Sequence, residues 1–241
     1  MGPLIRPPWG LLSAMTTTAE TLKESFGTIG KKYGYDRVGA EFVPYRDFKV
    51  KWTRSYKWAD FQVSDYLMDA PSVVLDGLAE TLFSRISGAE AKPYTPEMND
   101  WITAEEFRKE KQPIYIRRSR NISRSPAGKN KDLRESLDRL KDMGLIEKNM
   151  DPYLTWTKAE LQTTVGYCST LMNTVVISSA FDTRSLPDMV LDYALYHECL
   201  IIRNGWANFG IGEDFDMCQE EKKFPEWEEA EGWIRRMGLH F

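Results

Sequence analysis

The sequence contains few of the residues that cross-link small proteins or bind transition metals, with three cysteines and two histidines among 241 residues. Cys168, Cys199 and Cys218 cannot all pair and none lies in a Cys-x-x-Cys motif, which favours a reducing, cytoplasmic setting over a disulfide framework. No apolar run approaches the ~18 residues of a membrane span, so we expect no membrane partner. A net charge of -4 argues against a surface coated by nucleic acid.

The N-terminal residues show no structural pattern. Three prolines interrupt the apolar residues of 1–14, which makes this segment a poor signal peptide. Met15 precedes three threonines that suit a helix N-cap, and it is a candidate natural start. We expect residues 1–14 to be a disordered tail and residues 15–150 a region of helices and a hairpin. Residues 151–241 would form the core, continuous with 15–150 in one globular unit.

Hydrophobic periodicity predicts an α+β fold, with a small, mostly antiparallel sheet packed against helices. No internal repeat is visible. The most informative helix begins at Pro187, and we expect it to be central. The predicted helices cover residues 18–31, 71–88, 95–109, 132–143 and 226–237, and the predicted strands cover 47–55, 58–63, 113–117, 154–157, 165–168 and 171–178.

The helix after Pro187 carries a histidine followed directly by a glutamate, His197 and Glu198. In zinc peptidases of the zincin class, two histidines one helical turn apart bind the metal from one helix face. The glutamate beside the first histidine polarises the metal-bound water. Here Ile201 stands at the position of the second histidine, and an isoleucine cannot coordinate a metal. The sequence therefore predicts an incomplete metal site.

The residues around this helix resemble the core of SprT-like and related cytosolic zinc metallopeptidases, in which a strand hairpin precedes the His-Glu-x-x-His helix. The resemblance covers about residues 155–236 and is carried by VGYC at 165–168, VVISS at 175–179 and LPD at 186–188. Uncharacterised archaeal proteins with this core are also similar around residues 48–67 and 113–145. The resemblance implies a zincin-like core, and it places the third ligand, a histidine in those proteins, near Glu213.

The implied metal site has two candidate ligands, His197 and Glu213. Two protein ligands rarely retain zinc, so we expect either no cofactor or a weakly bound zinc. Without metal activation, water keeps a pKa near ~15.7 rather than ~7, which would make Glu198 a vestigial general base. Alternatively, Glu198 is a buried carboxylate held by hydrogen bonds or by an arginine such as Arg203. Cys199 lies about 200° around the helix from His197, so we expect it, and likewise Cys218, to pack in the core.

A basic, serine-rich stretch follows residue 116 and contains Arg117, Arg118, Arg120 and Arg124. It is a candidate phosphate-binding loop for nucleic acid. The alternative is a solvated loop whose arginines pair with the acidic C-terminal region. We favour the alternative because no aromatic residues are interleaved with the basic ones after Tyr115.

Three functions are consistent with these features. The favoured one is a metallopeptidase-like pseudoenzyme that acts by binding an unknown protein partner. The second is an active zinc metallopeptidase that uses His197, Glu213 and an unidentified third ligand. The third is a nucleic-acid-binding module built on residues 117–131. We favour the first because Ile201 and Glu213 both stand where histidines are expected.

Overall fold

The computed structural model describes residues 19–207, 209 and 215–241. Within those ranges the chain is mixed α+β, as expected, with eight α-helices and two three-stranded sheets. The expected tail at 1–14 and the candidate start at Met15 lie outside the described residues. No helix in the described ranges is long and apolar enough to cross a membrane.

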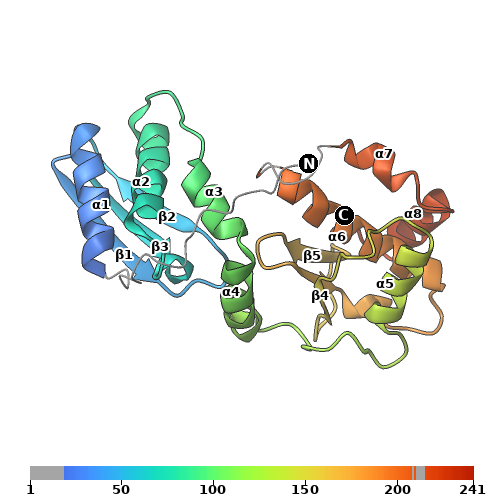
Figure 1. Ribbon diagram of the computed structural model, residues 1–241. Helices are drawn as coiled ribbons and strands as arrows, with labels where there is room; N and C mark the ends of the chain where they lie inside the picture. The colour runs from blue at the N-terminus through green and yellow to red at the C-terminus, as the bar shows by residue number, and fades with distance from the viewer. Residues whose placement is uncertain (1–18, 208, 210–214) are drawn as a thin grey trace, which may run out of the picture. The chain divides into compact units, whose positions relative to one another are not determined.

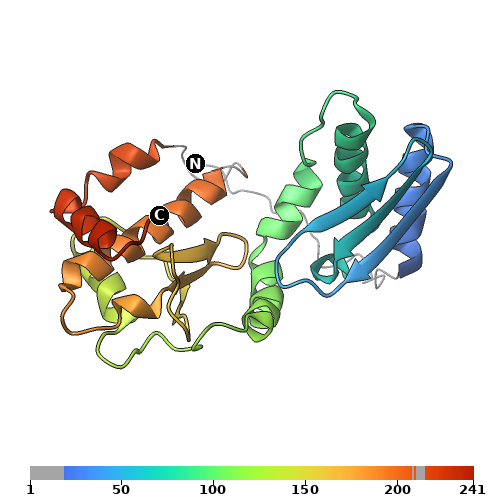
Figure 2. The same cartoon turned by 180° about the vertical axis from the view of Figure 1, so that it is seen from behind.

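The chain divides into two compact units between Ala104 and Glu105, whereas we expected one continuous unit whose core begins near residue 150. The difference arises because α5 packs on the helix that carries His197, so the second unit begins earlier in the chain. The units are drawn in Figure 1 and, from behind, in Figure 2, and each is described here by itself.

In the first unit, two helices cover one face of a three-stranded sheet (Figures 1 and 2). The central strand β3 pairs parallel with β1 and antiparallel with β2. The predicted apolar face of α1 is buried, and the rings of Phe26 and Phe83 each lie 5.0 Å from that of Phe61 on β3. The elements are α1 (Ala19–Lys32), β1 (Arg37–Val43), β2 (Val50–Arg54), β3 (Trp58–Ser64), the 3-10 helix η1 (Asp65–Leu67), α2 (Ser72–Ser87) and α3 (Pro96–Thr103).

The second unit is built around α6, which packs against α5, α7, α8, β5 and β6. Its sheet has the order β4-β6-β5, and all four residues of β6 are buried, as in a strand covered on both faces. The unit carries the helix on which His197 and Glu198 lie. Its elements are α4 (Glu105–Arg118), α5 (Leu133–Asp142), β4 (Tyr153–Trp156), β5 (Gly166–Ser169), β6 (Thr174–Ile177), the 3-10 helix η2 (Ser179–Phe181), α6 (Asp188–Ala207), α7 (Met217–Glu221) and α8 (Trp227–Arg236).

The two units repeat one topology. In each, a helix precedes three strands, the third strand lies in the middle of the sheet, and a 3-10 helix leads into the next long helix. The first and third strands are parallel, while the second and third are antiparallel. No repeat is visible in the sequence, because different apolar residues can fill the equivalent buried positions of the two units.

Two expectations about local structure are wrong, and one strand was not predicted. Residues 113–117 form no strand but belong to α4, which continues through Pro113. A short apolar run such as 114–116 has the same pattern in a buried helix turn as in a strand. β1 was not predicted at all. A single, mostly antiparallel sheet was expected, whereas the described residues form two sheets, each with one parallel and one antiparallel pairing.

Candidate functional site

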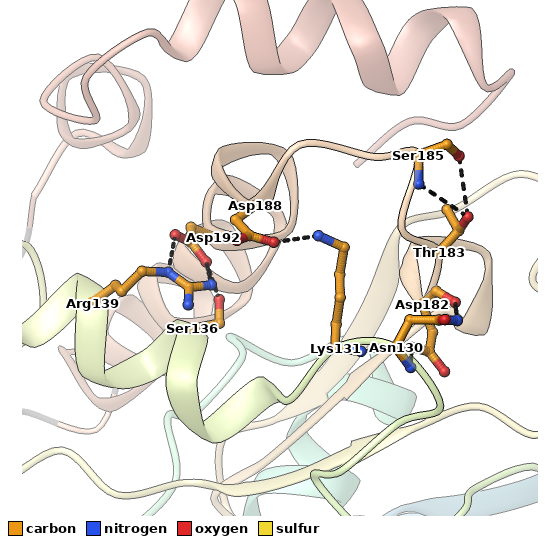
Figure 3. Close-up of polar contacts among 9 residues, drawn as sticks. All are labelled: Asn130, Lys131, Ser136, Arg139, Asp182, Thr183, Ser185, Asp188 and Asp192. Carbon is orange, nitrogen blue, oxygen red and sulfur yellow. Dashed lines mark hydrogen bonds and ion pairs between the residues drawn. The ribbon is translucent and has the colours of Figure 1, made fainter.

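The N-terminal part of α6 is fixed to α5 by a buried ion pair (Figure 3). Asp192, whose side chain is 3% exposed, accepts two hydrogen bonds from the Arg139 guanidinium at 2.8 and 2.7 Å and one from the Ser136 hydroxyl at 2.5 Å. One turn earlier on α6, the exposed Asp188 pairs with Lys131, whose side chain is 8% exposed. These contacts set the axial position of α6, and with it the position of His197.

The backbone at the end of the basic stretch donates hydrogen bonds to a carboxylate just after η2. The Asp182 carboxylate accepts the backbone N–H groups of Lys129, Asn130 and Lys131 at 2.6, 2.8 and 3.0 Å (Figure 3 labels Asn130 and Asp182). Such a concave row of N–H groups is an anion site, and here the chain supplies the anion itself. This part of the loop is therefore not available to an external phosphate.

The arginines of the stretch have separate roles. Arg117, Arg120 and Arg124 are exposed, while Arg118 is partly buried. Arg124 has a φ of 65°, and its guanidinium donates to the carbonyl oxygens of Arg117 and Ser119, each at 3.4 Å, at the C-terminal end of α4. A cation at a helix C-terminus is stabilising, so Arg124 serves the fold. The acidic C-terminal region was the expected partner, but its Glu220 pairs with Arg203 and Lys223.

His197 faces the short helix α7. Its Nδ1 lies 2.5 Å from Glu221 Oε1, with the two side chains 12% and 19% exposed. The Tyr196 hydroxyl donates to the Glu220 carbonyl oxygen at 2.9 Å, which holds α7 against α6. Burial lowers the pKa of His197, and the Glu221 contact opposes this effect without reversing it. At neutral pH the ring is therefore neutral and donates its Nδ1 proton to Glu221.

Glu198 is buried beside β5. The residue is 4% exposed, and its Oε2 has no hydrogen-bond partner in the part of the chain that the structure describes. Burial raises the pKa of Glu198 to about 7, which a hydrogen bond with Cys168 partly opposes. Gly166 makes room for this carboxylate, because a Cβ there would lie 3.3 Å from Glu198 Oε1 and 2.4 Å from the Val176 carbonyl oxygen. Glu198 is thus an interior carboxyl group.

The arginine expected beside Glu198 is elsewhere. Arg203 donates to Glu220 Oε2 at 2.7 Å and stacks over the Phe215 ring at 4.1 Å. Glu198 accordingly has no guanidinium partner among the described residues. Cys199 is buried, as expected, and burial raises the pKa of its thiol to about 12. The expectation that Cys218 packs in the core is wrong, since it lies exposed on α7, an element the sequence did not indicate.

The described residues do not complete a zinc site. Ile201 is 37% exposed one helical turn from His197, so the place of the second histidine is open to solvent but carries no donor. Glu213 lies outside the described residues. Within the described ranges, no three His, Cys, Asp or Glu side chains are grouped as metal ligands. His197 and Glu221 are two potential metal ligands that lie together. The Glu221 carboxylate contacts His197 Nδ1, and a carboxylate in this position commonly orients a histidine ring.

A separate cavity of about 350 Å³ lies on another side of α6. Its lining includes Arg108, Ile202, Arg203 and Trp206, but neither His197 nor Glu198. Ile202 and Trp206 lie roughly 140–180° around the helix from His197, which is why the two surfaces are separate. The side of α6 that carries His197, which we call the His197 face, is therefore separate from the cavity.

Two contributors to the His197 face were not predicted, Glu221 and Phe241. The Phe241 ring stacks on the His197 ring at 3.9 Å with 28° between the planes. Glu221 lies in the acidic C-terminal region, which was considered only as a partner of the basic stretch. Nothing in the local sequence marks Phe241, because 44 residues separate it from the histidine it covers.

Comparisons with known proteins return no relatives. The chain matches no protein-family model, and no significant match is found among curated proteins or solved structures. The function is therefore argued from the site alone.

Proposed function

We propose that the second unit is a metallopeptidase-like module of the SprT-like, zincin type that acts by binding and not by hydrolysis. The arrangement that supports this is a strand hairpin, β5 and β6, packed against a helix that carries His197 and Glu198. The observation that carries it is Ile201, exposed at the position where a zincin needs its second histidine. Zinc, if present, would be held weakly by His197 and a carboxylate.

The environment of Glu198 supports the same proposal. A general base must reach its water, within about 3 Å in hydrogen-bonded geometry. Glu198 is 4% exposed and its Oε2 is enclosed, which places the carboxyl group in the protein interior. Glu221 holds the His197 ring from α7, so this face carries an imidazole of fixed orientation.

The first test restores the missing donor. The Ile201→His variant is expected to copurify with zinc and to retain at least about ten times more than the wild type, because the added imidazole would join His197 and Glu213 as the third protein ligand that a zinc site needs. Ile201 is on the surface, so the substitution does not disturb the core. Zinc is measured by inductively coupled plasma mass spectrometry after dialysis, with Ile201→Gln as the control for polarity.

Two results would overturn the proposal. No gain of zinc in Ile201→His would mean that the helix does not present a zincin-like face. One zinc per wild-type chain, with peptide cleavage abolished by Glu198→Gln, would establish the second candidate, an active metallopeptidase.

A nucleic-acid-binding function remains as the other candidate, favoured by the exposure of Arg117, Arg120 and Lys129. If it holds, changing Arg117 and Arg120 to alanine should weaken binding of a labelled DNA duplex and reduce the salt slope of log K by about 2. Lys148→Ala, an exposed cation elsewhere on the unit, is the control. Absence of wild-type binding by fluorescence anisotropy at about 50 mM salt would exclude this candidate.

A further inference from the structure

Residues 239–241 lie beside residues 163–165, the segment that leads into β5. The His240 N–H donates to the Thr163 carbonyl oxygen at 2.9 Å, and the Val165 N–H donates to the His240 carbonyl oxygen at 3.1 Å. The pairing is a parallel β-bridge between Thr164 and His240. Thr164 precedes β5, the edge strand of its sheet, by two residues, so the segment pairs with the chain just before that edge.

The same segment places an aromatic ring on the candidate site. Phe241 stacks on His197 at 3.9 Å and meets the Tyr193 ring edge-on at 5.5 Å and 87°. Leu239 is buried, but Phe241 is 39% exposed, so one part of its surface contacts the site while another faces solvent. The segment is anchored at Leu239, and beyond it the backbone of His240 and the ring of Phe241 hold it to the unit.

We propose that the backbone edge at 163–165 and the His197 face of α6 form a groove for an extended peptide segment with an aromatic side chain. Residues 239–241 occupy this groove in cis. This inference rests on the proposed function, because both make the His197 face a binding surface, and it adds the class of partner. An incoming segment of another protein pairs with the backbone at 163–165 and stacks its ring on His197 in place of Phe241.

The contacts explain which peptide segments the groove would bind and why such a segment could replace residues 239–241. Backbone hydrogen bonds recognise any extended chain, while the stack of His197 and Tyr193 selects an aromatic side chain. The carboxylates of Glu221 and Glu231 act on His197 electrostatically, so the groove carries negative charge and favours a segment with basic neighbours. A tethered segment has an effective concentration of about millimolar, which a partner must overcome.

The experiment removes the aromatic stack that holds the internal competitor in place, while the backbone hydrogen bonds of His240 remain and compete more weakly. Phe241→Ala is expected to bind a fluorescein-labelled, end-capped peptide that copies residues 236–241 at least ten times more tightly than the wild type does. A peptide with alanine in place of the phenylalanine should lose that binding. Phe241→Leu keeps an apolar side chain without the aromatic stack and should bind the peptide nearly as well as Phe241→Ala.

A second readout follows His197 itself. Removing the ring re-exposes the imidazole, so the pKa of His197, measured by NMR titration, should rise toward its ordinary value in Phe241→Ala. Equal peptide binding by the wild type and both variants, or no binding by any of them, would overturn the groove. The zinc measurement on Ile201→His does not depend on peptide binding, so each proposal can fail without the other.

Discussion

Glu198→Gln is expected to stabilise the protein by about 2–3 kcal/mol at pH 8.5, an unusual result for a substitution at a buried polar residue. Burial raises the pKa of Glu198 from 4.5 to about 7, so the folded chain binds its proton more tightly than the unfolded chain does. This contribution is fully present below pH 4.5 and is lost as the pH rises through 7. Above that point the ionised carboxylate is buried without an ionic partner, and glutamine removes this penalty.

The advantage of Glu198→Gln should therefore fade toward zero as the pH falls to 4.5, as measured by urea unfolding across pH. Glu220→Gln provides the control with the opposite sign. A hydrogen bond from Lys223, aided by Arg203, lowers the pKa of Glu220, so its contribution is present above the unfolded pKa and lost in acid. Glu220→Gln should be less stable than the wild type near neutral pH. A Glu198→Gln variant that is less stable at pH 8.5 would show that the carboxylate is needed in its ionised form.

Asp192→Ala is expected to destabilise the second unit by about 2–3 kcal/mol, because it leaves the buried Ser136 hydroxyl unsatisfied and removes the ionic partner of Arg139, which is 36% exposed. The pair joins α5 to α6 five residues before His197, so its loss also loosens the helix that carries the candidate site. Chemical denaturation followed by far-ultraviolet circular dichroism measures the loss, and hydrogen exchange of α6 amides locates it.

Asp151→Ala is the matched control for this prediction. Asp151 also pairs with a cation of α5, Arg134, but the two side chains are 69% and 43% exposed. Solvent screening limits such a pair to about 1 kcal/mol or less. Equal losses in the two variants would mean that burial of Asp192 does not set the strength of its ion pair.

The helix boundaries followed closely from the sequence where local signals agree. The apolar spacing of α5 and the glycine after it predicted a helix over 132–143, and the structure has α5 at Leu133–Asp142 with Gly144 at a φ of 73°. The hairpin strands β5 and β6 and the start of α6 after Pro187 were predicted in the same way. The prediction of a strand at 113–117 was wrong, because a run of three apolar residues is too short to show whether the spacing is that of a helix or of a strand.

For the candidate site, the sequence by itself determined which groups are chemically present: a histidine beside a glutamate on one helix, and an isoleucine where a second donor would stand. Helical geometry fixes their relative angles without any tertiary contact. Only the tertiary structure decided that Glu221 orients His197, that Glu198 is buried and that Phe241 covers the imidazole. These contacts join residues 24 to 44 positions apart, or depend on burial that a local pattern does not report. Long-range packing determines which residues meet, because the local sequence around many carboxylates and aromatic rings of the chain does not distinguish one from another.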